Sequence, residues 1–244
     1  MEIPLDLRVG ELIRRPNRFV FEGKVGECIQ RWHCPVTGSI GLIKDFCEVP
    51  CLFTPAVGGD GRRTQGTVEA ISLSRGADWI GINQNRINGW IERFLRNNAL
   101  PHMIDCAGCC VRREVKIGDS RLDLVVENGE KRTFLELKTP TRDLLLFPGD
   151  HFTRPPSATY FDRGLRHFKA LAELAQLGHR TIVALCFMYD APPLTTPARD
   201  RWNAKIIDTI SEANARGVEN WQINLKISPT SIKITLCTKY SYKN

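Results

Sequence analysis

Short apolar runs separated by turn-forming residues fill the chain from Phe19 to about Ile82. The interruptions include Glu22-Gly23, Pro35, Thr37-Gly38, Pro50, Pro55 and the segment Gly58-Gly59-Asp60-Gly61. Strands that are this short and this regularly interrupted are typical of a small β-barrel. The pattern therefore predicts a barrel for the first part of the chain.

A different pattern begins near Asn85. Apolar residues then recur three and four positions apart, at Ile87, Trp90, Ile91, Phe94 and Leu95. This spacing places all five on one face of a helix, and Pro101 follows the end of that helix. We expect an amphipathic helix whose aromatic residues belong to the core.

The remaining pattern alternates strands and helices. Strands are expected over 111–117, 121–126, 132–137 and 181–188, helices over about 163–177 and 203–215, and a hairpin over 223–236. Asn128-Gly129 suits the tight turn of a hairpin, and Gly178 and Gly217 suit the ends of the two helices. The coarse prediction is a β-barrel followed by an α/β domain.

Composition narrows the class of protein. The chain has 244 residues, of which 42% are hydrophobic and 25% charged, without an apolar run long enough to cross a bilayer. Nine cysteines form an odd count, and the first residues do not resemble a signal peptide. We therefore expect a soluble cytoplasmic protein with reduced thiols and no membrane partner.

The net charge of +7 favours a polyanionic partner, although the same charge can simply keep a protein soluble. Chemistry is suggested by Asp123, which interrupts an apolar strand, and by Glu136 and Lys138, which share a face of the next strand. Charged groups inside a sheet are costly unless they are paired or ligate a cation. Two neighbouring carboxylates suit Mg²⁺ or Mn²⁺, and a lysine beside them suits phosphodiester hydrolysis. The alternative is an ion network that only holds the hairpin.

The pattern Asp-x12-Glu-x-Lys, after a helix that carries Glu92, resembles the core of PD-(D/E)XK nucleases. More specifically, the chain resembles the sugar fermentation stimulation protein A (SfsA) family over nearly its whole length. The similar segments are Leu12–Phe19, His33–Gly38, Gly81–Asn83, Asn88, Glu114–Asp123, Leu135–Lys138, Arg163–His167, Gly178–Arg180, Pro197–Arg199 and Ser211–Glu219.

The resemblance implies an α/β (α+β overall) fold. Residues 1–84 would form an OB-like β-barrel domain, and residues 85–244 a PD-(D/E)XK nuclease-like α/β domain with a central mixed sheet. It also implies a DNA-binding role that is linked in bacteria to sugar-metabolism genes. OB barrels track single strands with basic grooves and stacking aromatic residues.

In the family pattern, Asp123, Glu136 and the Leu137 carbonyl would hold the metal, and Lys138 would be catalytic. Glu114 would be a further acid, and Glu92 would be the acid of the helix. Nucleic-acid contacts are expected from basic residues, namely Arg18, Arg62, Arg63, Lys116, Arg121, Arg163, Arg166 and His167. For Arg62 and Arg63 a solvated loop is an equal alternative.

Two departures from the family pattern affect the barrel loop and the loop before Arg163. Val36 replaces the asparagine of the usual His-Cys-Pro-Asn-Thr-Gly motif in the barrel loop. The loop before Arg163 is a few residues longer than in the family, and either Phe147-Pro148 with Asp150 or Pro156-Ser157-Ala158 corresponds to the usual Phe-Pro-Asp-Ala-x-Thr motif. Cys106-x2-Cys109 has zinc-like spacing but lacks a second ligand pair, so thiols are favoured over zinc.

The sequence predicts a nuclease that acts on DNA or RNA. The main alternative is a non-catalytic DNA-binding regulator with a vestigial metal site, and a weaker one is a sugar-metabolism factor that binds a partner protein. A homodimer is left open.

Overall fold

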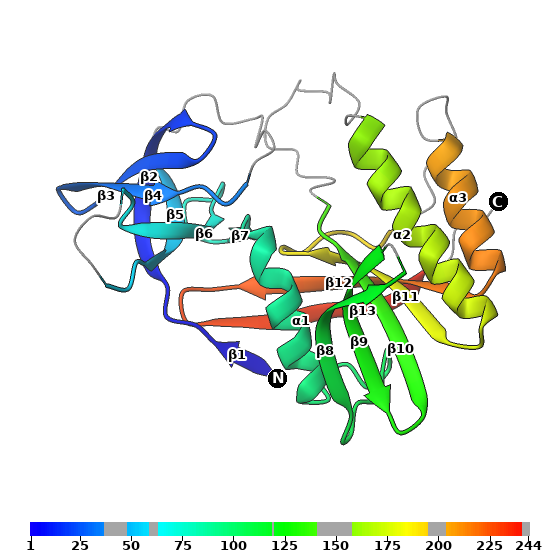
Figure 1. Cartoon of the computed structure of the whole chain (residues 1–244). Coiled ribbons are helices and arrows are strands. Elements are labelled where there is room, and N and C mark those ends of the chain that lie inside the picture. Colours follow the sequence, from blue (N-terminus) through cyan, green and yellow to red (C-terminus); the bar gives the residue numbers. More distant parts are fainter. Residues whose placement is uncertain (37–47, 59–62, 119, 141–157, 195–203, 241–244) are drawn as a thin grey trace.

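Two β-sheets organise the chain. The computed structural model describes residues 1–36, 48–58, 63–118, 120–140, 158–194 and 204–240. Within this part, a six-stranded sheet forms the first unit and a seven-stranded sheet with helices forms the second. Figure 1 shows the smaller sheet beside one end of the larger one.

The smaller sheet closes into an OB-like barrel, as expected. Its strands are β2 (Arg8–Asn17), β3 (Val20–Val25), β4 (Cys28–His33), β5 (Val49–Pro55), β6 (Gly66–Ile71) and the short β7 (Ile80–Gly81). The five strands β2 to β6 close because β4 pairs with β6. Trp32 stacks on Phe53 in the core, with 4.5 Å between their ring centroids. A Cβ atom at Gly23 would overlap the Trp32 ring, so the close approach of this strand requires glycine.

The larger sheet is mixed. Its order is β1-β13-β12-β11-β10-β9-β8, and β10, β11 and β12 run parallel. The strands are β1 (Glu2–Pro4), β8 (Cys110–Ile117), β9 (Ser120–Asn128), β10 (Lys131–Lys138), β11 (Arg180–Phe187), β12 (Val218–Ile227) and β13 (Ser231–Tyr240). Because β1 pairs with β13, the first strand of the chain lies in this sheet and not in the barrel. The division at residue 84 stays a prediction.

Helices cover both faces of the larger sheet (Figure 1). After the short 3-10 helix η1 (Gln84–Arg86), α1 (Ile87–Arg96) packs on one face, and α2 (Ala158–Gln176) and α3 (Ala204–Ala215) pack on the other. The five apolar residues that predicted α1 are all buried. None of the described helices combines the length and the apolar character that a membrane-crossing segment needs.

A buried acid lies where the barrel meets the α/β unit. Glu69 on β6 accepts hydrogen bonds from Asn83, from Thr54 and from the Arg86 guanidinium, which is 2.7 Å from Glu69 Oε1. Buried charge is stable only when it is paired in this way. Glu69 therefore links the barrel wall to the start of α1.

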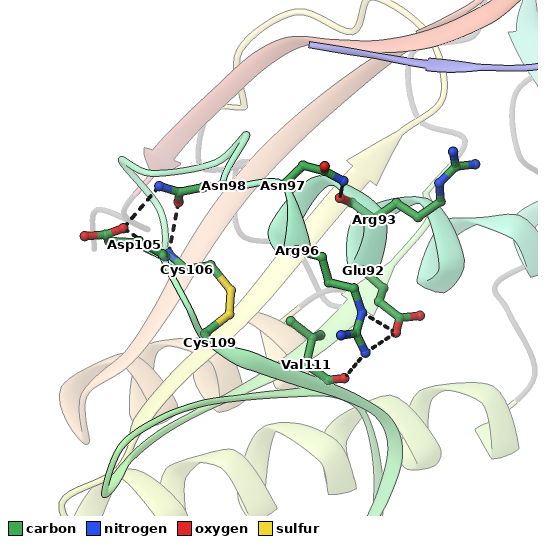
Figure 2. Close-up of a disulfide and its surroundings, with 10 residues drawn as sticks. Glu92, Arg93, Arg96, Asn97, Asn98, Asp105, Cys106, Cys109 and Val111 are labelled. Atoms are coloured by element: carbon green, nitrogen blue, oxygen red, sulfur yellow. Dashed lines mark hydrogen bonds and ion pairs between the residues drawn. A yellow bond between two sulfur atoms is a disulfide. The ribbon is translucent and has the colours of Figure 1, made fainter.

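The segment between α1 and β8 corrects one expectation. Cys106 and Cys109 form a disulfide across a tight turn, with 4.9 Å between their Cα atoms, so these two thiols are not reduced. Figure 2 shows the disulfide beside Asn98, whose side chain accepts a hydrogen bond from the Cys106 amide and donates one to Asp105. The two-residue spacing brings the sulfur atoms together, whereas the sequence led us to expect free thiols at both positions.

Candidate active site

The acidic cluster lies where β9 and β10 separate. The antiparallel ladder between these strands ends at the pair Leu124 and Leu135. Beyond it, the Asp123 side chain enters the space between the strands, and its Oδ2 accepts a hydrogen bond of 2.7 Å from the Leu137 amide. A side chain thus replaces the main chain as acceptor, which fixes Asp123 beside β10.

The other oxygen of Asp123 is held from α1. Asn88 Nδ2 donates to Asp123 Oδ1 over 2.9 Å. Burial and then the nearby charge of Glu136 raise the pKa of Asp123, and the two donors only partly offset this effect. Burial and repulsion therefore disfavour the charged form of Asp123, whereas the Leu137 amide and Asn88 favour it.

Glu136 is only 2% exposed, and its two oxygens differ. Oε1 accepts a hydrogen bond of 2.6 Å from Lys138 Nζ and is also bonded to Nδ1 of His167 on α2. Oε2 is buried and has no hydrogen-bond partner within the described part of the chain. Burial acts to raise the pKa of Glu136, but His167 and Lys138 outweigh it, so the pKa is lowered. Glu136 is therefore a stable anion with one free oxygen.

Three of the four predicted catalytic residues meet here: Asp123, Glu136 and Lys138. Leu137 directly follows Glu136, and its amide donates a hydrogen bond to Asp123, so the Leu137 main chain connects the two acids. Glu114 is elsewhere: its side chain is exposed on β8 and pairs with Arg121 over 3.1 Å. Its role as a further acid stays a prediction that this geometry does not support.

Two contacts were missed by sequence reasoning. Glu92 was expected as the helix acid, but it pairs with Arg96 and Arg113 away from the cluster, and Asn88 reaches Asp123 instead. His167 was expected to contact phosphate, but its largely buried ring bonds Glu136. The only signal for Asn88 was its place in a family-like segment.

The predicted nucleic-acid contacts are dispersed. Lys116 and Arg121 are cross-strand neighbours on β8 and β9, and both are exposed. Arg166 is exposed on α2 directly before His167, whereas Arg18 and Arg63 are exposed on the barrel unit. Arg62 and the side chain of Arg163 lie outside the described residues.

The donor set suits one class of metal. No group of three or more His, Cys, Asp or Glu side chains in the described ranges could hold an ion. Two carboxylates, one with a free buried oxygen, match Mg²⁺ or Mn²⁺, which keep several waters and take only one or two protein carboxylates. Zinc at Cys106 and Cys109 is not supported, because their sulfur atoms are bonded to each other.

Comparison with known proteins agrees with this architecture. The family model described as "Sugar fermentation stimulation protein RE domain" matches residues 85–231. A sugar fermentation stimulation protein homolog of Teredinibacter turnerae is 31% identical, over 91% of this chain and 92% of its own length. The chain belongs to the SfsA family.

Another SfsA-family relative, from Alcanivorax borkumensis, is 30% identical over 90% of each chain. The solved structure of Pyrococcus furiosus SfsA in complex with Ca²⁺ is similar over 100% of this chain and 98% of that one, with a TM-score of 0.70 and 25% identity. These findings confirm the family and the fold expected from the sequence.

Proposed function

We propose that this SfsA-family protein is a divalent-metal-dependent nuclease that binds DNA or RNA and hydrolyses its phosphodiester bonds. The observation that carries the proposal is Glu136 Oε2, a buried and unpartnered carboxylate oxygen next to Asp123. A buried carboxylate oxygen without a partner is costly even when the charge itself is paired, and a bound cation would supply the missing contact. A protein that only binds a polyanion gains nothing from burying two acids at this place.

Asp123, Glu136 and the Leu137 carbonyl would hold Mg²⁺ or Mn²⁺. Such an ion lowers the pKa of a bound water and offsets the negative charge of the phosphate. The Pyrococcus furiosus relative was solved with Ca²⁺, another hard divalent cation that prefers oxygen ligands, and this supports a similar site here.

The residues around the carboxylates have separable roles. The Leu137 amide and Asn88 fix the orientation of Asp123. His167 holds Oε1 of Glu136 and so leaves Oε2 for the ligand. Lys138 is partly exposed, so its ammonium can turn from Glu136 to orient a water or to stabilise charge that develops on the phosphate.

A nucleic acid fits the charge of the protein. The net charge of +7 attracts polyanions, and Arg166 lies one residue from His167 on the same helix. Lys116 and Arg121 extend from the strands next to the cluster. These cations would contact phosphates and orient the strand without reading its sequence.

One observation favours a second candidate, the non-catalytic DNA-binding regulator. Lys138 and His167 both bond the same oxygen of Glu136, and such a network could persist without any metal. In that case the cluster would be structural, and nucleic-acid binding would be the whole activity.

Cleavage assays decide between the two. Labelled single- and double-stranded DNA and RNA are incubated with Mg²⁺, Mn²⁺ or EDTA, using the wild type, Glu136→Gln and Glu130→Gln. The last is a matched control, because Glu130 is an exposed acid in the β9–β10 turn. We expect cleavage by the wild type and by Glu130→Gln only with metal, and a loss of about 10²-fold or more in Glu136→Gln.

A folded wild type that binds nucleic acid but cleaves none of the four substrates with either metal would contradict the nuclease and favour the regulator. Equal cleavage by Glu136→Gln and Glu130→Gln would remove the carboxylate cluster from the chemistry. Thermal unfolding of each variant shows whether a loss of activity reflects a loss of folding.

A further inference from the structure

The turn at the end of the β2–β3 hairpin presents an aromatic ring to solvent. Strand β2 ends at Asn17 and β3 begins at Val20, so Arg18 and Phe19 form a two-residue turn. Phe19 is 45% exposed, and the Arg18 guanidinium carbon lies 4.5 Å from the centroid of its ring. The turn therefore offers a flat apolar surface and a positive charge at the same place.

Hydrogen bonds from the end of β2 and from the residue after β4 hold the backbone of this turn. Asn17 Oδ1 accepts from the Phe19 amide over 2.9 Å, and the Cys34 amide donates to the Phe19 carbonyl over 2.8 Å. Arg15 Nη2 donates to the carbonyls of Arg18, over 2.9 Å, and of Val36, over 2.8 Å. These bonds preorganise the exposed ring and so reduce the entropy that a ligand would lose on ordering it.

A single exposed apolar side chain needs no explanation by itself. This one differs because a half-buried arginine is used to fix the turn that exposes it. Such anchoring does nothing to bury the Phe19 ring, but it keeps the position of the ring constant. A fixed aromatic ring under a guanidinium is a surface on which a planar, electron-rich group can stack.

The surrounding charge selects a polyanionic partner. Arg14 and Arg31, on the strands beside β3, both pair with the single carboxylate of Glu22, so the three residues carry a net positive charge. Arg18 adds a further exposed cation at the turn. A polyanion that carries planar groups is a nucleic acid. Its bases can stack on Phe19 only when they are unpaired, because in a duplex the face of each base is covered by its neighbours.

We propose that the Arg18–Phe19 turn is a stacking site for one unpaired base, so that the barrel binds single-stranded nucleic acid and discriminates against duplex. The inference rests on the proposed function only in that the partner is a nucleic acid. It does not depend on cleavage, because the turn belongs to the barrel and the carboxylate cluster to the larger sheet.

Fluorescence anisotropy in EDTA tests the site without cleavage, with labelled single-stranded and duplex DNA of the same sequence. Phe19→Ala should weaken single-strand binding by about 10-fold, Phe19→Tyr should stay within about 2-fold of the wild type, and duplex binding should not change. The slope of the logarithm of the binding constant against the logarithm of the salt concentration should stay the same in Phe19→Ala, and its magnitude should fall by about 1 in Arg18→Ala. Ile29→Ala is the matched control, since Ile29 is an exposed apolar residue at the other end of the β3–β4 ladder.

Unchanged single-strand affinity in Phe19→Ala, or an equal loss in Ile29→Ala, would overturn the stacking site even if the protein cleaves nucleic acid. Conversely, a wild type that binds single strands through Phe19 but never cleaves would keep the stacking site and refute the nuclease. If Phe19→Ala lowers the melting temperature, Phe19→Leu separates packing from stacking: it should bind as weakly as Phe19→Ala, and wild-type affinity would overturn the proposal.

Discussion

Replacement of Glu219 by glutamine should destabilise the fold without affecting the candidate active site. Glu219 lies near the start of β12 and accepts two hydrogen bonds from the Arg180 guanidinium, of 2.7 Å and 3.0 Å. The Trp221 indole donates to it over 2.9 Å, and Lys239 lies 3.4 Å away. One carboxylate therefore joins the three strands β11, β12 and β13.

The size of the effect follows from the pKa of this group. Burial acts to raise it, but the hydrogen bonds from Arg180 and Trp221 and the charge of Lys239 lower it from 4.5 to about 2. In the absence of solvent screening, such a shift corresponds to about 3 kcal/mol of stability. Because Arg180 and Lys239 are 39% and 59% exposed, solvent screening reduces the expected loss to about 1–2 kcal/mol.

The sign of the pH dependence is fixed by the direction of the shift. A lowered pKa stabilises the folded state above pH 4.5, and this stabilisation is lost as the pH falls through about 2. Urea unfolding of Glu219→Gln and the wild type should therefore differ most near neutral pH, and the difference should shrink in acid.

Glu212→Gln is the matched control. Glu212 is exposed on α3 and, among the described residues, its carboxylate pairs along the helix with Arg216, so its loss should cost less than about 0.5 kcal/mol. If the two variants unfold at the same urea concentration, or if the Glu219→Gln deficit persists unchanged in acid, the hydrogen bonds and ion pairs of Glu219 do not stabilise the sheet as argued. Metal-dependent cleavage should be unchanged in both variants.

Three further predictions concern the cluster and the disulfide. Lys138→Met should lower the single-turnover cleavage rate by about 10²-fold while oligonucleotide affinity changes little, and a parallel loss of affinity would make Lys138 a phosphate contact. Burial and the charge of Glu136 raise the pKa of Asp123, so the contribution of this carboxyl group to folding stability is fully present below pH 3.8 and is lost as the pH rises through the raised pKa. Asp123→Asn should therefore have a higher melting temperature than the wild type in EDTA at neutral pH, and a lower melting temperature would contradict this. A reducing agent should lower the unfolding free energy by at most about 2 kcal/mol in the wild type and leave the Cys106→Ala/Cys109→Ala variant unchanged.

Local pattern was sufficient to predict most elements of the fold. The helix α1 was predicted because its five apolar residues repeat at helical spacing, and the strands β8 to β10 because a tight turn separates β9 and β10 at Gly129. The start of α2 was placed too late: the helix begins at Ala158, whereas sequence analysis placed its start near Arg163. The first turn of a helix need not show an apolar period, so hydrophobic spacing marks where the apolar face begins and not where the helix begins.

The candidate site was only half predictable for a similar reason. Asp123, Glu136 and Lys138 lie on one hairpin, so strand alternation and a short turn bring them together. Asn88 and His167 lie on helices. Asn88 is 35 residues from Asp123 in the sequence, and His167 is 31 residues from Glu136. Their contacts depend on how each helix is rotated and where it crosses the sheet, which hydrophobic spacing does not determine.

The hydrogen bonds of the two acids suggest how the site can accept a cation without rearranging. Within the described part of the chain, each oxygen of Asp123 has one donor. Because a carboxylate oxygen has two lone pairs, both oxygens keep an acceptor position after bonding Asn88 and the Leu137 amide. On Glu136 both donors bond Oε1, and Oε2 has no hydrogen-bond partner among the residues that the structure describes. The fold therefore uses its donors to orient the carboxylates and keeps lone pairs unused on each. In a network that only held the hairpin together, every buried carboxylate oxygen would be expected to accept a hydrogen bond.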